Sequence, residues 1–200
     1  MNEEKTIKKL DRKDCCGCSA CAQKCPAKAI VMKEDKEGFS YPNIDKNKCI
    51  NCGLCIKVCP QLTYQEKKKE NFPIAYACYN HDDNELLKSS SGGFFSAIAD
   101  YVLESKGIII GAAFDKNLIL KHIAINDKED LYKLRGSKYI QSNINEMYKR
   151  AEEELKNNKT VLFTGTPCQI AGLKAYLMKD YEKLSRIVAM SFCEPRSWVD

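Results

Sequence analysis

The sequence predicts two folded parts, a small α+β module over residues 1–64 and an α/β domain over residues 74–200. Two observations lead to this division. Eight of the 12 cysteines fall in two matching runs before residue 60. After residue 74, apolar segments with strand character alternate with segments of helical periodicity. The charged run 65–71 and the Phe-Pro pair that follows it predict a linker over residues 65–73.

The two cysteine runs share one spacing. The first consists of Cys15, Cys18, Cys21 and Cys25, the second of Cys49, Cys52, Cys55 and Cys59, and a proline follows each run. Both read C-x2-C-x2-C-x3-C-P, the spacing of bacterial ferredoxins that bind two 4Fe-4S clusters. The first three thiolates of a run can each reach one iron of a cubane, and the fourth points to the other cubane. One cluster is therefore predicted on Cys15, Cys18, Cys21 and Cys59, and the other on Cys25, Cys49, Cys52 and Cys55.

Other uses of these cysteines fit the pattern less well. Zinc sites use paired C-x2-C knuckles with a longer gap between them, so a third cysteine two residues on has no place in the tetrahedron. A disulfide framework needs an oxidising compartment. Cys16 is an extra thiol in the first run and is not counted as a ligand. Between the runs, residues 29–33 and 39–44 predict two short strands joined by a turn at 35–38, which completes a ferredoxin-like module.

Composition limits the function classes. No stretch approaches the roughly 20 apolar residues of a membrane span, and the charged N-terminus does not read as an export signal. We therefore expect a cytoplasmic protein without a membrane span. The formal charge of +5 is spread along the chain, whereas nucleic-acid-binding domains concentrate basic residues on one face, so no nucleic-acid partner is expected. Two cubanes with their thiolates would bring the net charge to about +1.

The second part alternates strands and helices. Strands are predicted over residues 74–79, 107–114, 119–125, 160–164 and 187–192, and helices over residues 94–103, 143–157 and 169–178. This alternation indicates an α/β sheet with its loops on one edge. Cys78 is expected to be a small core residue of its strand. His81 is expected in an exposed polar turn, and His122 in a strand without a second ligand nearby.

Two loops of this domain carry residues suited to chemistry. Residues 89–93 precede a helix, and their small side chains would let backbone N–H groups approach a phosphate. A serine-rich N-cap with flexible glycines is the alternative. In the second loop, residues 165–169, Thr166 can cap the next helix, and Cys168 in its first turn is expected to have a lowered pKa and to be present as a thiolate. The alternative for Cys168 is a small buried residue under the turn.

Four motifs occur in the order of a known family. They are the double cysteine module, Ser90-Ser91-Gly92-Gly93-Phe94, residues 134–142 (LRGSKYIQS) and residues 165–173 (GTPCQIAGL). In this order they resemble the coenzyme F-420 hydrogenase/dehydrogenase beta-subunit family, including its relatives with an N-terminal ferredoxin domain. The resemblance implies an oxidoreductase that binds FAD and passes electrons between the flavin and two 4Fe-4S clusters. It further implies coenzyme F-420 as a possible hydride donor or acceptor, and a redox partner protein or subunit.

Residue by residue, the resemblance implies a flavin site in the second domain. Ser90, Ser91, Gly92 and Gly93 match the FAD-contacting loop, Arg135, Gly136, Ser137 and Lys138 match a basic loop suited to the flavin or its phosphates, and Thr166, Pro167, Cys168 and Gln169 match the loop that borders the flavin. Lys138 near the flavin would stabilise the anionic reduced ring by placing charge where charge develops. Lys138 and Cys168 are thus the candidate catalytic residues. Cys168 fits equally a packing thiol, a reactive thiolate or a further metal ligand.

The end of the chain departs from the family pattern. After the cysteine that matches Cys193, relatives continue with a His-Gly-x-Pro-Ser loop and a long C-terminal half, whereas this chain ends at Asp200. We therefore expect an incomplete flavin-binding domain, from a truncated or frameshifted product or from a protein whose C-terminal half is encoded separately. Two rival functions follow. One is a ferredoxin-type electron carrier or adaptor without flavin, and the other is a fragment that does not fold beyond the cysteine module.

Overall fold

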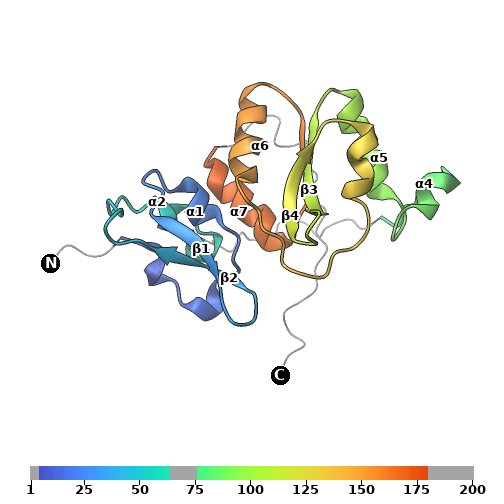
Figure 1. Ribbon diagram of the computed structural model, residues 1–200. Helices are drawn as coiled ribbons and strands as arrows, with labels where there is room; N and C mark the ends of the chain where they lie inside the picture. The colour runs from blue at the N-terminus through green and yellow to red at the C-terminus, as the bar shows by residue number, and fades with distance from the viewer. Residues whose placement is uncertain (1–4, 64–75, 180–200) are drawn as a thin grey trace.

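The computed structural model describes residues 5–63 and 76–179, which form two packed parts (Figure 1). The predicted linker at 65–73, the predicted strand at 187–192 and Cys193 lie outside the described residues. Helices and strands are mixed in both parts. Among the described helices, none is long and apolar enough to cross a membrane.

The N-terminal module is built from short elements around the cysteine runs. It contains the 3-10 helices η1 (Ile7–Lys9) and η2 (Arg12–Asp14), the helices α1 (Ala20–Lys24), α2 (Leu54–Lys57) and α3 (Pro60–Thr63), and the strands β1 (Ile30–Glu34) and β2 (Ser40–Ile44). The strands form the predicted antiparallel hairpin, with Ile30 opposite Ile44. Asp35 closes the turn because its carboxylate accepts hydrogen bonds from the backbone N–H groups of Glu37 and Phe39, each at 3.0 Å.

Few large apolar side chains are buried in this module. Its core cluster consists of Ile7, Cys21, Ile30, Cys55 and Cys59. A core of this kind buries little apolar area, so it contributes little hydrophobic stabilisation. Because cysteines make up so much of the core, the module depends for its stability on what those cysteines bind.

The second part is a three-stranded sheet with helices on both faces. The strands β3 (Ile108–Phe114), β4 (Leu120–Ile125) and β5 (Val161–Phe163) lie in the order β4-β3-β5. β3 and β4 form an antiparallel hairpin, whereas β5 runs parallel to β3 with Val161 opposite Ile108. The helices are α4 (Asp83–Leu87), α5 (Phe94–Glu104), η3 (Lys128–Lys133), α6 (Met147–Lys156) and α7 (Pro167–Leu177).

Alternate residues of β3 point to opposite faces of the sheet and divide the core into two clusters. Ile108 and Ile110 pack in one cluster with side chains of α6 and α7, Tyr148 among them. Ile109 packs in the other cluster with Val102 of α5. Figure 1 shows the result: α6 and α7 stand between the sheet and the N-terminal module, and α5 covers the far face.

The two parts of the chain pack against each other. Cys18, Ala20 and Val58 of the N-terminal module belong to the same buried apolar cluster as Phe163 and Leu173 of the second part. The contact is made by α1 and α3 on one side and mainly by α7 on the other. The first cysteine run therefore lies at the boundary between the two parts.

Most predicted elements of the second part are present, and one is not. The helices predicted at 94–103, 143–157 and 169–178 and the strands predicted at 107–114, 119–125 and 160–164 occur with shifted ends. The strand predicted over 74–79 is wrong for its described residues, because 76–79 pair with no strand of the described sheet. Cys78 is correspondingly exposed and is not the core residue expected. His81 is exposed, as predicted.

Candidate functional site

The eight cysteines of the two runs line two separate cavities. One cavity is lined by Cys15, Cys18, Cys21 and Cys59, with Cys16 beside them. The other is lined by Cys25, Cys49, Cys52 and Cys55. Each cavity takes three cysteines from one run and the fourth from the other run. This grouping coincides with the crossed ligand sets that the spacing predicts.

The two cysteine loops repeat one backbone conformation. Gly17 and Asn51 precede the second cysteine of their runs, the middle one of the first three, and have φ values of 65° and 53°. Ser19 and Gly53 follow the middle cysteine and have φ values of 65° and 74°. Left-handed residues on both sides of the middle cysteine curl the chain tightly, which lets three cysteines at two-residue spacing line one cavity. The sequence repeat is thus also a repeat of backbone geometry.

The surroundings of Cys21, one of the thiols of the first cavity, oppose its ionisation. Burial, followed by the neighbouring thiols Cys15, Cys59 and Cys55, raises the pKa of Cys21 to about 12. A thiol must lose its proton before it can bind iron, because the thiolate is the ligand. Cluster binding is therefore linked to proton release and is favoured by higher pH.

Backbone N–H groups are directed at sulfur atoms of the second cavity. The N–H group of Ala29 donates a hydrogen bond to Sγ of Cys25 at 3.3 Å. Burial raises the pKa of Cys55, and backbone hydrogen bonds from Ile7 and Ile56 act in the opposite direction. Donors aimed at sulfur stabilise the charge of a thiolate and tune the potential of a cluster that it binds.

The donor set fits a cubane rather than a single ion. Within the described ranges, no three His, Cys, Asp or Glu side chains are close enough to share one metal ion. A tetrahedral zinc site would require that closeness. In a 4Fe-4S cluster each thiolate binds its own iron, so four cysteines arranged around a hollow suit the group.

The first two predicted flavin loops lie close together. The Ser137 hydroxyl is 3.4 Å from the Ser90 hydroxyl, and both residues are exposed. Gly93 has a φ of 74° and stands at the N-terminus of α5. The carbonyl of Gly92 accepts a hydrogen bond from the backbone N–H of Asn80 at 2.7 Å, which ties the loop to the preceding segment. The loop 90–93 thus leads into α5 through Gly93 without a side-chain cap, so the serine N-cap given as the alternative is not found, and Ser90 and Ser91 are exposed.

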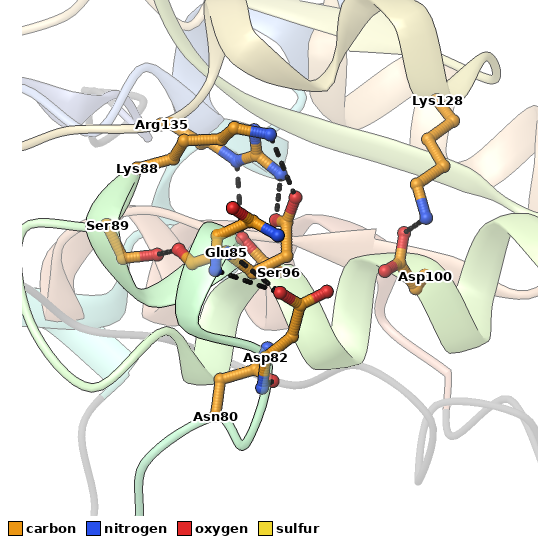
Figure 2. Close-up of polar contacts among 10 residues, drawn as sticks. Asn80, Asp82, Glu85, Lys88, Ser89, Ser96, Asp100, Lys128 and Arg135 are labelled. Carbon is orange, nitrogen blue, oxygen red and sulfur yellow. Dashed lines mark hydrogen bonds and ion pairs between the residues drawn. The ribbon is translucent and has the colours of Figure 1, made fainter.

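Both basic side chains of the second loop have partners within the chain. Figure 2 shows Arg135 directed at Glu85, with which it forms an ion pair, and at Ser96, whose hydroxyl accepts a hydrogen bond at 3.2 Å. The Lys138 ammonium donates to the carbonyls of Leu134 and Arg135 at 2.9 and 2.7 Å, at the C-terminal end of η3. Burial lowers the pKa of Lys138. Both cations of the second loop are thus engaged within the chain.

Gln169 organises the third loop through a buried hydrogen-bond network. Its side-chain carbonyl accepts from the backbone N–H of Thr166 at 2.9 Å, and its amide donates to the Ser142 hydroxyl at 3.0 Å. Ser142 lies 3.1 Å from Nδ1 of His122, and Nε2 of His122 lies 2.9 Å from the carbonyl of Thr164. A carbonyl only accepts, so Nε2 carries the proton and Nδ1 accepts from Ser142. Gln169 therefore supports the loop from inside, while Thr166 and Pro167 are exposed.

The lowered pKa predicted for Cys168 is wrong. A hydrogen bond to Cys16 and burial raise the pKa of Cys168, and its contact with Thr166 at 3.1 Å offsets them only in part. For Cys16, the hydrogen bond from Cys168 lowers the pKa, but Cys18 and burial raise it more, to about 11. Both thiols are protonated at neutral pH. The position of Cys168 in the first turn of α7 does not outweigh its neighbours.

Segment 134–142 connects the other two loops to the cysteine module. Its two serines contact residue 90 and Gln169, as described above. Gln141 accepts a hydrogen bond from the backbone N–H of Ser40 at 3.1 Å. Gly17 leaves room for this side chain, since a Cβ there would lie 2.5 Å from Nε2 of Gln141. Segment 134–142 and the loop 165–169 thus adjoin the boundary at which the first cysteine run lies, and the loop 90–93 contacts this segment through Ser137.

Tyr148 joins the two parts at this boundary and was not predicted as a site residue from the sequence. Its buried hydroxyl lies 2.8 Å from the carbonyl oxygens of both Cys18 and Gln169. The backbone of α7 comes close because Gly172 has no side chain: a Cβ there would lie 2.8 Å from the Tyr148 hydroxyl. In the sequence, Tyr148 is one of several apolar residues along an amphipathic helix, and no local signal marks its hydroxyl. The contact between Cys16 and Cys168 was missed for the same reason.

Comparison with known families matches both parts of the chain. Residues 14–62 and 41–84 match two models of the 4Fe-4S dicluster domain. Residues 75–149 match the model of the coenzyme F-420 hydrogenase/dehydrogenase beta subunit, N-terminal region. No match was found among curated proteins. The resemblance inferred from the four ordered motifs is confirmed.

Proposed function

We propose that this chain holds two 4Fe-4S clusters in its two cysteine-lined cavities. The proposal is supported by the match of residues 14–62 to a 4Fe-4S dicluster domain and of residues 75–149 to the coenzyme F-420 hydrogenase/dehydrogenase beta-subunit family. The role of the chain is iron–sulfur electron transfer within an oxidoreductase of this type. The observation that carries the proposal is the crossed grouping of the eight cysteines. The beta-subunit family implies a multi-subunit complex. We therefore propose that the chain exchanges electrons with a redox partner subunit.

We assign one cluster to Cys15, Cys18, Cys21 and Cys59, and the other to Cys25, Cys49, Cys52 and Cys55. A bound 4Fe-4S cluster would accept and donate one electron at a time. The chain supplies the thiolates, the N–H donor of Ala29 toward Cys25 and the apolar side chains that restrict water. Ile7, Met32 and Pro42 line the first cavity, and Ile30 and Ile44 line the second. Restricted water and N–H donors are two of the features through which a protein sets a cluster potential.

Pairs of cysteine substitutions test the crossed assignment. We expect Cys15→Ala and Cys59→Ala each to cost about four irons, and the double variant to cost no more, because both thiols serve one cluster. Combining Cys15→Ala with Cys25→Ala should instead cost about eight irons. Iron and sulfide are counted after anaerobic reconstitution, and Cys78→Ala, outside both runs, is the control. If the Cys15–Cys59 pair costs about eight irons and the Cys15–Cys25 pair about four, the assignment is wrong.

We further propose that FAD binds where the loops 90–93 and 135–138 meet. The proposal is supported by the contact between Ser90 and Ser137, by the exposure of both, and by the family match over this region. Segment 134–142 also reaches Gly17 of the first cysteine run, so a flavin on these loops would have a short path to the first cluster. A bound flavin accepts a hydride as two electrons and releases them singly. Coenzyme F-420 is the proposed hydride partner.

In this proposal the residues of the second part have distinct tasks. The backbone of 90–93 and the hydroxyls of Ser90 and Ser137 bind the cofactor. Arg135 and Lys138 fix the shape of the second loop through Glu85 and the carbonyls of η3, and Lys138 meets the flavin only after leaving those carbonyls. The exposed residues of the third loop border the site.

Flavin binding is tested by titrating the reconstituted chain with FAD and following quenching of flavin fluorescence. We expect one FAD per chain, and we expect Ser90→Asp to weaken binding at least about tenfold because a carboxylate would face the phosphates. Asn157→Asp, which adds the same charge beyond the end of α6, should bind as the unmodified chain does. A chain with about eight irons that binds no FAD would leave the electron-carrier function alone.

A further inference from the structure

Cys16 and Cys168 bring two thiols together where the two parts of the chain meet. Cys16 is the thiol of the first run that the cluster spacing leaves over, and Cys168 lies in the first turn of α7. The two thiols are close enough for each to affect the ionisation of the other. Both are free and partly buried. Cys16 also lines the first cavity, beside the four cysteines assigned to a cluster.

Contacts on either side hold this pair in position. The Tyr148 hydroxyl lies 2.8 Å from the carbonyl of Cys18, two residues from Cys16, and 2.8 Å from the carbonyl of Gln169, next to Cys168. One turn further along α7, a Cβ on Gly172 would lie 3.1 Å from Sγ of Cys18. The backbones that carry the two thiols are therefore fixed in close approach. Close approach of the two backbones is one requirement for a disulfide.

We propose that Cys16 and Cys168 form a reversible disulfide that joins the two parts of the chain beside the first cysteine-lined cavity. The oxidant is a low-molecular-weight disulfide. One thiol of the pair attacks a sulfur of this reagent, forms a mixed disulfide and releases one small thiol. The second thiol then attacks the mixed disulfide and releases the other small thiol. Two thiols of the chain are oxidised, one disulfide is reduced to two thiols, and the two protons leave with the released thiols.

The bond would turn a non-covalent boundary into a covalent one. The bond would close a loop that contains all residues between Cys16 and Cys168. A disulfide across so long a loop strongly restricts the conformations of the unfolded chain. The first cysteine loop would then stay on α7 when the hydrogen bonds of Tyr148 open. The proposal does not depend on the clusters, because neither thiol is assigned as a ligand.

The test uses the reconstituted chain under anaerobic conditions. The chain is equilibrated at increasing ratios of oxidised to reduced glutathione, free thiols are trapped with N-ethylmaleimide, and tryptic peptides are identified by mass spectrometry. We expect a peptide pair joining Cys16 to Cys168 to increase with the oxidised fraction and to disappear in excess dithiothreitol, with the iron content unchanged. Cys16→Ser and Cys168→Ser should each abolish the pair, and Cys78→Ser should not.

Three results would overturn the proposal. The first is full alkylation of both thiols at every glutathione ratio. The second is a linked peptide pair that persists in Cys16→Ser, because the bond would then lie on another cysteine of the same peptide. The third is the loss of about four irons in Cys16→Ser or Cys168→Ser, because that thiol would then be a cluster ligand. None of these changes the iron content of the unmodified chain, on which the proposed function rests.

Discussion

His122 is held uncharged by its surroundings, which makes the second part of the chain sensitive to acid. The residue is 1% exposed, and burial lowers its pKa from 6.5 to about 4. Its neutral form satisfies both ring nitrogens, through Ser142 and Thr164. The pKa is lower in the folded than in the unfolded chain. The stabilisation is therefore fully present above about pH 6.5 and is lost as the pH falls toward 4.

We expect the unmodified chain to lose about 2 kcal/mol of unfolding free energy between about pH 7.5 and pH 5 that His122→Gln does not lose. The measurement is urea unfolding of both chains at the two pH values, followed by far-ultraviolet circular dichroism. Acid also attacks clusters, but it does so in both chains, so the difference between them isolates the histidine. Equal losses in the two chains would contradict the assignment of the buried neutral state.

Cys168 illustrates why single-residue environments were hard to predict. Its place after Thr166 in the first turn of a helix was read correctly, and a helix N-terminus alone lowers a thiol pKa. The neighbour that reverses this effect, Cys16, is far away in the sequence and reaches it only through packing of the two parts. The environment of Arg135 was equally hard to predict. Its ion-pair partner, Glu85, lies in α4, a helix that was not predicted from the sequence.

At the scale of elements, α7 depends on a glycine at the point where it meets the first cysteine loop. A Cβ on Gly172 would lie 2.8 Å from the Tyr148 hydroxyl and 3.1 Å from Cβ and Sγ of Cys18. We expect Gly172→Ala to lower the unfolding free energy by about 1 to 2 kcal/mol, because crowding outweighs the better helix propensity of alanine. Thermal unfolding measures the change. Lys174→Ala, on the exposed side of α7, should change stability by less than about 0.5 kcal/mol, and an equal effect of the two would sink the argument.

Hydrophobic periodicity predicted the helices and strands whose pattern lies within their own segment. It failed where pairing with a distant strand determines the local structure. The strand at 74–79 has a suitable composition, but residues 76–79 gain no partner in the described sheet. The helix predicted from Asn143 begins only at Met147, because Asn143 pairs with β4: it accepts a hydrogen bond from the N–H of His122 at 2.8 Å and donates to the carbonyl of Leu120 at 3.0 Å. The local composition does not indicate that pairing with a distant strand replaces the first turn of the helix.

At the scale of the whole molecule, the sequence predicted the parts better than their boundary. The doubled spacing was sufficient to predict the ferredoxin-like module and the crossed grouping of its cysteines. The boundary rests on contacts between residues distant in sequence, such as Tyr148 with Cys18 and Gln141 with Ser40. No local sequence signal marks any of these residues as a contact between the two parts. Only the folded chain shows that the first cysteine run lies beside two motifs of the second part, segment 134–142 and the loop 165–169.

This shared boundary makes the stability of α7 depend on iron bound in the other part. Cys18 and Ala20 pack in one apolar cluster with Leu173 of α7, and Cys18 is an assigned ligand. Removing iron with a chelator should free the first cysteine loop and so weaken the face against which α7 packs. We expect amide hydrogen exchange in α7 to accelerate, whereas exchange in α5, which packs with Ile109 on the opposite face of the sheet, should change little. Comparable acceleration in both helices would indicate general unfolding, and no change in α7 would show that the boundary forms without the cluster.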